Sequence, residues 1–231
     1  MCGRCVILTF DEVLDVIRRI EAYAPIGPEA DWPARRPPQA PEAFPNSLVP
    51  VIVPTFDTAR PFGVFAPGSL EALSFAWGFE ESWKPGVVFN ARIESAAKPT
   101  WRESMEHRRC VIPVTSFFET HESEKVPSPR TGRPVKRPYR FEVPGESIVL
   151  IGGIWRDGRF SMVTTEANAD MAPIHHRMPL VLRQDELPVW LGPDYARLAD
   201  RSAIPLNAEP ADAGSKASGS AGDELGQQSL F

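Results

Sequence analysis

The residue of most chemical interest is the cysteine at position 2, in the opening run MCGRC. Removal of Met1 would leave Cys2 with an α-amine and a thiol on adjacent carbons. An α-amine is a weaker base than a lysine side chain, so more of it is unprotonated and nucleophilic at pH 7. Together the two groups can trap an aldehyde as a Schiff base and close it to a five-membered thiazolidine. The alternative is a cysteine without function at a frayed chain end.

Cys2 also forms a Cys-x-x-Cys pair with Cys5, a spacing found in zinc and redox sites. Cys110 and a histidine could complete a four-ligand zinc site. However, the chain has no second close cysteine pair, and Cys110 falls in a predicted strand, where a buried structural thiol is typical. Three cysteines cannot form a closed disulfide framework, which favours free thiols and a cytoplasmic location. We therefore expect no metal and no cofactor.

Three further runs place polar residues in settings that suit catalysis. FNARIES (89–95) contains Asn90 where a predicted strand becomes a helix. RCVIPVTSFFET (109–120) ends in two phenylalanines and Glu119. A carboxylate against an apolar wall is a candidate general acid or base, whereas an edge-strand glutamate facing water is not. IHHRMPLVL (174–182) contains two adjacent histidines, of which a strand would point only one inward.

The order and spacing of these runs is more specific than any one of them. MCGR, NAR-x-E, R-C-x-I-P-x-x-x-F-x-E, T-T-x-A-N and I-H-x-R-M-P follow one another across residues 2 to 190. This pattern resembles the SOS response-associated peptidase (SRAP) family. The resemblance implies a covalent crosslink between the N-terminal cysteine and the ring-opened aldehyde of abasic sites in single-stranded DNA. It also implies removal of the protein's own leading residue.

The resemblance further implies a role for each matching residue. Cys2 would be the nucleophile and amine donor, Asn90 would position it, Glu119 would transfer protons, and His175 would help to open the deoxyribose ring. DNA contacts would come from Arg4, Trp77, Arg92 and Thr164. Around the glutamate the family pattern Asp-Gly-Phe-Tyr-Glu-Trp is replaced here by TSFFET (115–120), which puts local DNA contacts and substrate breadth in question.

The elements that must position these residues point to an α+β fold with a mostly antiparallel sheet. A Thr9–Glu12 capping box and apolar residues at helical spacing predict a helix over 10–23. Strands are predicted at 48–53, 61–66, 72–79, 110–118, 138–143, 148–155 and 160–165, and helices at 92–108, with a break near Pro99, and at 185–191. Proline at 50 and 54 predicts an edge or broken first strand. Residues 121–137 predict a polar hairpin loop.

Charge and hydropathy exclude some function classes. The 231-residue chain is 42% hydrophobic, enough for a core. It lacks the ~18-residue apolar run of a membrane helix. Its N-terminus also lacks the charged region followed by an apolar region that is typical of a secretion signal. Its net charge is −5, and residues 185–231 alone, with eight acids and three bases, account for all of it. The remainder is neutral and can still present a basic groove to DNA.

The C-terminal composition predicts a separate tail. Residues 2–207 would form the SRAP-like domain, and residues 208–226 would be a disordered linker. The final QQSLF resembles the bacterial sliding-clamp motif, with Gln227, Leu230 and Phe231 as its contacts; the alternative is a terminus without function. Two other function classes remain open. One is a non-catalytic single-stranded DNA-binding module docked on the clamp, and the other is a cysteine peptidase acting on other proteins.

Overall fold

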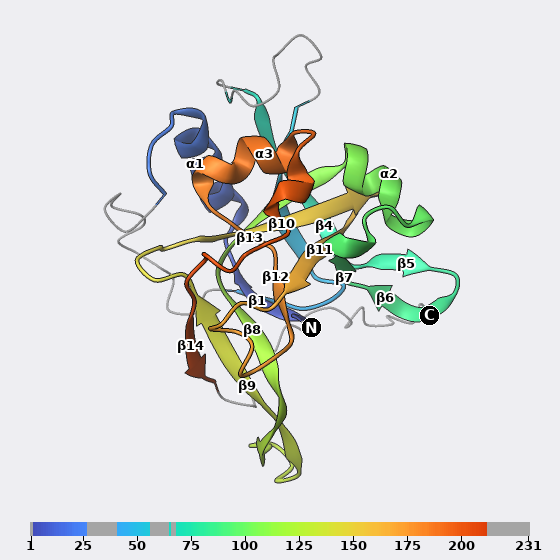
Figure 1. Ribbon diagram of the computed structural model, residues 1–231, viewed down its shortest axis with the longest axis vertical. Coiled ribbons are helices and arrows are strands. Elements are labelled where there is room, and N and C mark those ends of the chain that lie inside the picture. The colour runs from blue at the N-terminus through green and yellow to red at the C-terminus, as the bar shows by residue number, and fades with distance from the viewer. Residues whose placement is uncertain (1, 27–40, 56–64, 66–67, 212–231) are drawn as a thin grey trace, which may run out of the picture.

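The structure, a computed structural model, describes residues 2–26, 41–55, 65 and 68–211 (Figure 1). The strands are β1 Arg4–Ile7, β2 Glu42–Ala43, β3 Leu48–Pro54, β4 Leu70–Trp77, β5 Phe79–Glu81, β6 Lys84–Val88, β7 Asn90–Arg92, β8 Arg109–Pro127, β9 Pro134–Glu142, β10 Val149–Arg156, β11 Arg159–Glu166, β12 Arg177–Pro179, β13 Val181–Leu182 and β14 Asn207–Pro210. The helices are α1 Phe10–Glu21, α2 Pro99–His107 and α3 Leu187–Leu191, with 3₁₀ turns η2 Ile93–Ser95, η3 Gln184–Glu186 and η4 Tyr195–Leu198.

One large sheet organises the molecule. Its pairings close a ring, because β8 pairs with both β3 and β10, β10 pairs with β11, β11 with β4, and β4 with β3. Among the recorded pairings only β11 with β4 and β11 with β7 are parallel. The predicted α+β class with a mostly antiparallel sheet is therefore confirmed.

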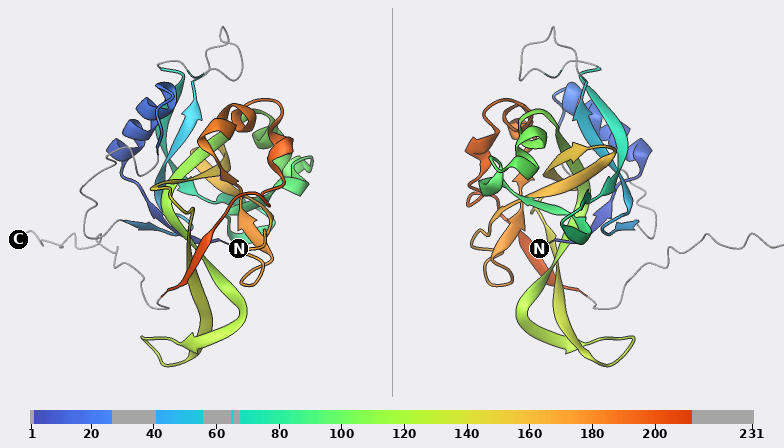
Figure 2. Two further views of the ribbon diagram at one scale, coloured as in Figure 1. Left: turned by 60° about the vertical axis from the view of Figure 1, so that its left-hand side comes forward. Right: turned by 90° about the vertical axis from the view of Figure 1, so that its right-hand side faces the viewer.

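The helices lie at one end of the sheet, and the outer parts of β8 and β9 project from the other as a two-stranded arm (Figures 1 and 2). α1 forms as predicted, since the Thr9 side chain accepts from the Glu12 amide and the Glu12 carboxylate accepts from the Thr9 amide. Its buried face, Val13, Val16, Ile17 and Ile20, joins the same apolar cluster as residues of α2 and α3. The helix therefore needs the sheet to cover its apolar stripe.

The prediction of an edge or broken strand at 48–53 is wrong. β3 is an internal strand, paired with β4 along its whole length and with β8 on its other side. The pairing with β8 is recorded only at Ile52 opposite Val111, so Pro50 and Pro54 are not required to donate hydrogen bonds on that side.

The prediction of a polar hairpin loop over 121–137 is right about the hairpin but wrong about the length of the loop. β8 runs on to Pro127 and β9 begins at Pro134, with Val126 opposite Val135. Charged side chains suggest a loop, but the paired backbone of a two-stranded arm tolerates them on its exposed faces. The loop itself is confined to the turn between the two strands, where the Ser128 and Gly132 amides are hydrogen-bonded.

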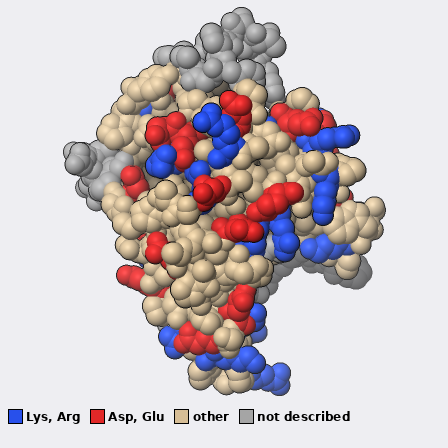
Figure 3. Space-filling model, viewed as in Figure 1, with Lys and Arg blue, Asp and Glu red and all other residues tan. Residues whose placement is uncertain are grey.

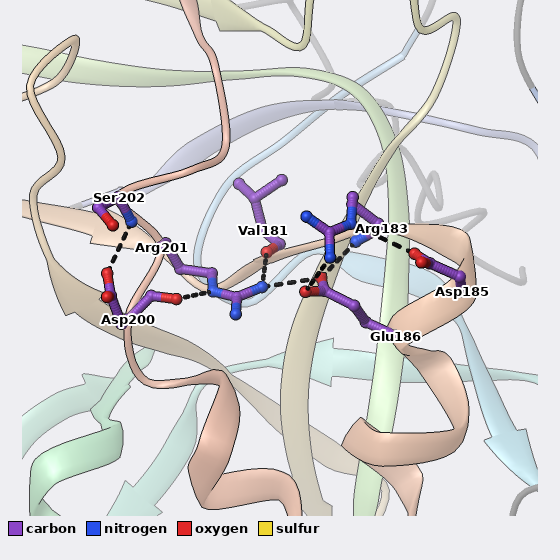
Figure 4. A network of polar contacts seen from close by, with 7 residues as sticks. All are labelled: Val181, Arg183, Asp185, Glu186, Asp200, Arg201 and Ser202. Carbon is purple, nitrogen blue, oxygen red and sulfur yellow. Dashed lines mark hydrogen bonds and ion pairs between the residues drawn. The ribbon is translucent and has the colours of Figure 1, made fainter.

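The C-terminal part of the described chain is fixed to the sheet at two places. Arg201 forms a buried ion pair with Glu186 at 2.8 Å and also donates to the Val181 carbonyl (Figure 4). β14 then pairs with β9, so the predicted domain boundary at 207 falls inside a strand. Linker residues from 212 and the QQSLF motif lie outside the described residues. Within the described ranges no helix has the length and apolarity needed to cross a membrane.

Candidate active site

Cys2 is held against the sheet by the strand that follows it. β1 pairs with β8, with Arg4 opposite Phe118, and Cys2 precedes this ladder with 1% of its surface exposed. Burial, together with the negative charge of Glu119, raises the pKa of the Cys2 thiol to about 12. The thiol is therefore protonated at neutral pH, and the carboxylate of Glu119 lies within electrostatic range of it.

Asn90 reaches the same place from a different part of the sheet. β7 pairs with β11 in parallel, with Asn90 opposite Met162. The Asn90 Nδ2 atom donates a hydrogen bond of 2.9 Å to the Cys2 carbonyl. Asn90 is 7% exposed, and its Oδ1 atom is buried without a hydrogen-bond partner among the described residues. A buried acceptor of this kind is an unusual feature that calls for a ligand or a functional reason.

Glu119 lies on β8 opposite Tyr139, directly after Phe117 and Phe118. Only 3% of the surface of Glu119 is exposed, so it is not the water-facing edge-strand glutamate that was the alternative. Its Oε1 atom accepts a 3.1 Å hydrogen bond from the Thr120 amide. A buried carboxylate beside a buried thiol is an arrangement suited to proton transfer.

His175 is buried and His176 is exposed, so only one of the two adjacent histidines points inward, as expected from the sequence. The His175 Nδ1 atom lies 3.0 Å from the Arg177 amide nitrogen, from which it can accept, and 3.2 Å from the Arg177 carbonyl oxygen, to which it can donate in the other tautomer. Burial lowers the pKa of His175, and the charge of Glu119 opposes that effect. His175 is therefore neutral at pH 7 and lies within the field of Glu119.

A β-bulge in β8 holds the His175 loop in place. Thr120 lies opposite Pro138 but Lys125 lies opposite Lys136, so β8 carries three more residues than β9 in this interval. Within the bulge the Glu122 amide donates to the Ile174 carbonyl at 3.0 Å, and the Glu122 carboxylate is hydrogen-bonded to Nδ1 of the His176 ring. Bulges beside functional sites commonly redirect side chains in this way. The sequence reasoning missed Glu122, because the bulge depends on pairing with β9.

Arg177 was also missed. It is 6% exposed and makes a two-pronged contact with the Glu94 carboxylate at 3.0 and 2.8 Å, and it donates to the Thr164 carbonyl at 3.0 Å. Both partners stand in the quoted motifs, as the arginine of I-H-x-R-M-P and the glutamate of NAR-x-E. The motifs were therefore a signal that these two segments meet.

The residues expected to contact DNA fall into two groups. Arg92 is exposed, and Arg4 is partly exposed, bound to the Glu42 carboxylate at 3.0 and 2.5 Å with its guanidinium over Phe118. Trp77 and Thr164 are 0% and 1% exposed.

The expected stacking of a base on Trp77 is therefore wrong for this structure. Its ring stacks on Phe160 inside the core, and its Nε1 atom donates to the Phe89 carbonyl at 3.0 Å. The expected DNA contact of Thr164 is corrected in the same way, since its hydroxyl faces the Ala91 carbonyl at 3.5 Å. The sequence could not show this, because the residue type alone does not tell whether a tryptophan in a strand points into the core or toward the surface.

Metal-ligand spacing within the described ranges occurs at Glu122, His175 and His176, whose ligand atoms lie within 4.8 Å of one another. The Cys-x-x-Cys pair does not form such a group there, and Cys2, Cys5 and Cys110 are buried free thiols. A cavity of about 800 Å³ lies elsewhere, between Ile26 and residues 143–150 and 203–205, and none of the four candidate catalytic residues lines it.

Comparison with known proteins gives a consistent result. A family model described as "SOS response associated peptidase (SRAP)" matches residues 1–214. The "Abasic site processing protein YoaM" of Bacillus subtilis is 30% identical over 132 residues, which are 51% of this chain and 55% of that protein. The "Abasic site processing protein YedK" of Escherichia coli is 28% identical over 57% of this chain and 62% of that protein. The matched region thus spans little more than half the length of these curated relatives.

Solved structures share the fold over a larger part of the chain. A crystal structure of a protein from Bacteroides thetaiotaomicron has a TM-score of 0.60 at 24% identity and covers 90% of this chain and 91% of its own. A phage-related protein from Bordetella bronchiseptica has a TM-score of 0.59 at 18% identity and covers 91% of this chain and 94% of its own. At these identities the likeness supports the fold alone.

Proposed function

The chain belongs to the SOS response-associated peptidase family, and from this premise we propose that it processes abasic sites in single-stranded DNA by forming a covalent link through Cys2. The observation that carries the proposal is the hydrogen bond from Asn90 to the Cys2 carbonyl beside the buried carboxylate of Glu119. It brings together groups that lie 88 residues apart in the chain. A purely structural cysteine needs neither neighbour.

The proposed reaction begins once Met1 has been removed. The free α-amine of Cys2 attacks the C1′ aldehyde of the ring-opened deoxyribose, and loss of one water gives a Schiff base. The Cys2 sulfur then adds to the imine carbon, and the thiol proton passes to the nitrogen, closing a thiazolidine. Water is the only leaving group, and no oxidant or reductant is needed.

The raised pKa of Cys2 favours the amine as the first nucleophile. With a pKa of about 12, roughly one thiol in 10⁵ is ionised at pH 7. The thiol therefore waits protonated until the imine forms beside it. We assign the proton transfers to Glu119, which is buried next to the thiol and changes its pKa through its charge.

His175 and Asn90 take supporting roles in the proposal. We assign to His175 the transfer of a proton to the sugar ring oxygen as the ring opens. The unsatisfied Asn90 Oδ1 atom can accept a hydrogen bond from the freed α-amine and aim its lone pair at the aldehyde. We propose the same site for release of Met1, in which water hydrolyses the Met1–Cys2 peptide bond and Glu119 takes a proton from the water and gives one to the leaving amine.

The two alternative functions are less well supported. A cysteine peptidase needs a thiolate at neutral pH, usually paired with a nearby histidine, whereas burial holds the Cys2 thiol in its protonated form. A DNA-binding module that does not react has no use for a buried Glu119 beside a buried thiol.

The test is a crosslinking assay. The protein is incubated with an oligonucleotide carrying one abasic site, denatured in detergent, and examined for a band of lower mobility. We expect a band that the Cys2→Ala variant does not give, and mass spectrometry should show that Met1 is missing from the reactive protein. Retention of Met1 throughout, or a band that persists in Cys2→Ala, would contradict the proposal.

We also propose that the tail carries the domain to the replication machinery in the cytoplasm through Gln227, Leu230 and Phe231. Residues 208–226 number 19, and a flexible linker of that length spans roughly 24 Å. Part of it, up to Pro210, is used by β14, so the free tether is shorter than the composition predicted. Fluorescence anisotropy of a peptide of the last ten residues with a bacterial clamp tests this. The Leu230→Ala, Phe231→Ala peptide is the control, and equal binding of both would refute the contact.

A further inference from the structure

The arm formed by β8 and β9 carries a concentration of positive charge that the reaction at Cys2 does not use. Between Lys125 and Lys136 the chain has four basic residues, Lys125, Arg130, Arg133 and Lys136, and no acidic residue. All four side chains are exposed. This twelve-residue segment thus holds a charge of +4 in a protein whose net charge is −5.

Lys125 and Lys136 lie on one face of the arm, and Arg130 and Arg133 lie in the turn at its tip. Lys125 and Lys136 are directly opposite one another, and like charges at opposed positions destabilise a strand pair. The other face is neutral, because Val126 lies opposite Val135 and Arg137 is bound to Glu124 at 2.9 Å. Within the described part of the chain the four bases have no such ion pair. Figure 3 shows Lys and Arg side chains gathered toward the tip of the arm and acidic ones nearer its base.

The arm leaves the active site directly. Glu119 and Lys125 stand on the same strand, and their partners on β9, Tyr139 and Lys136, are three residues apart, which in an extended strand is about 10 Å. The turn at the tip is held by hydrogen bonds from the Ser128 amide to the Arg133 carbonyl and from the Gly132 amide to the Ser128 carbonyl, both 2.8 Å. The bases are therefore carried on a paired scaffold at a fixed reach from the reacting atoms.

We infer that this arm binds the phosphate backbone of the DNA strand that flanks the abasic site. The inference rests on the proposed function, which places DNA at Glu119, and it adds a second contact region to it. An opposed Lys125–Lys136 pair is unfavourable in the free protein and becomes favourable when a phosphate lies between the two ammonium groups. At about 3.4 Å per stacked nucleotide along a strand, 10 Å corresponds to roughly three nucleotides from the lesion.

The test compares two variants of equal charge. The arm variant is Lys125→Gln, Arg130→Gln, Arg133→Gln, Lys136→Gln. The control removes four exposed bases at the helical end of the molecule: Arg18→Gln, Lys98→Gln, Arg102→Gln, Arg197→Gln. Fluorescence anisotropy measures binding to an oligonucleotide carrying a tetrahydrofuran abasic analogue, which has no aldehyde and cannot crosslink, between 50 and 200 mM salt.

Each engaged phosphate contributes about 0.7 to the slope of log K against log salt for single strands, so four contacts contribute about 2.8. The wild-type advantage over the arm variant should therefore shrink by roughly 50-fold across that fourfold salt range. The control should keep the wild-type slope. The difference should vanish with oligonucleotides that end fewer than about three nucleotides from the lesion on the arm's side.

Equal slopes for the arm variant and the control would overturn the inference. That result is also the one expected if the arm binds an acidic protein partner in place of DNA. A difference that persists with the shortest oligonucleotides would also overturn it. The proposed function is tested separately, by the wild-type crosslink to an aldehyde-bearing oligonucleotide. Its failure would leave the salt slopes still able to decide the role of the arm.

Discussion

Replacing Glu119 with glutamine should change two properties of the site in opposite directions. The side chain keeps its size and its buried position but loses its negative charge. Because the charge of Glu119 adds to burial in raising the pKa of Cys2, its loss lowers that pKa and makes the thiol more reactive. Each 1.4 kcal/mol of repulsion removed raises the thiolate fraction about tenfold at fixed pH. Crosslinking should nevertheless slow by about 10² to 10⁴-fold, since a positioned proton-transfer group typically contributes that much.

Two assays on the same samples measure these effects. Alkylation by iodoacetamide reports thiol reactivity, and band formation with an abasic oligonucleotide reports crosslinking. The protein is released from a cleavable fusion that leaves Cys2 as the first residue, so that the mature terminus does not depend on Glu119. Glu71→Gln, an exposed glutamate on β4, is the matched control and should change alkylation little. Faster alkylation with undiminished crosslinking would refute a role for Glu119 in proton transfer, and slower alkylation would refute the electrostatic argument.

Three further outcomes follow from burial in the described structure. Trp77→Phe should leave the affinity for single-stranded DNA within about twofold but lower the free energy of unfolding in urea titrations by about 2 kcal/mol, because a hydrogen bond is lost and a cavity is created. A large loss of affinity with unchanged stability would restore the stacking role. Glu186→Gln should lower the free energy of unfolding by about 3 kcal/mol because it leaves the Arg201 guanidinium buried without its counter-charge, whereas the exposed Asp185→Asn should change it by less than about 0.5 kcal/mol. Burial lowers the pKa of His175, so below its ordinary pKa of 6.5 the residue gains a proton on unfolding, and the free energy of unfolding should fall as pH drops through that value. His175→Gln should flatten this dependence of stability on pH, and an unchanged dependence would contradict the lowered pKa.

Elements defined by local signals were predictable from the sequence. The Thr9–Glu12 capping box fixes the start of α1, and Pro99 occupies the first position of α2, which agrees with the break expected there. Such signals act within a few residues of one another, so no knowledge of the fold is needed to read them.

The failures all concern which strands meet and which faces they bury. Pro50 suggests an edge, but β3 is internal because its pairing with β8 is restricted to one residue pair. Trp77 reads as an exposed aromatic, but its strand turns it into the core. The candidate site shows the same limit, because Asn90 and Cys2 are brought together by register in a sheet and only a motif pattern could anticipate that they meet. Glu122 carries no local signal at all, since a bulge exists only relative to a partner strand.

The surplus of three residues in β8 has a consequence for variation in length. On the core side of the bulge, the pairing of Phe117 with Phe141 is fixed by packing. On the side of the tip, Lys125 pairs with Lys136 in a register that is independent of the core. Insertions or deletions made symmetrically in the outer hairpin are therefore absorbed without rotating Glu119 off its face. The outer hairpin can accordingly be shortened, extended or exchanged as a cassette while the reactive end of the molecule keeps its geometry.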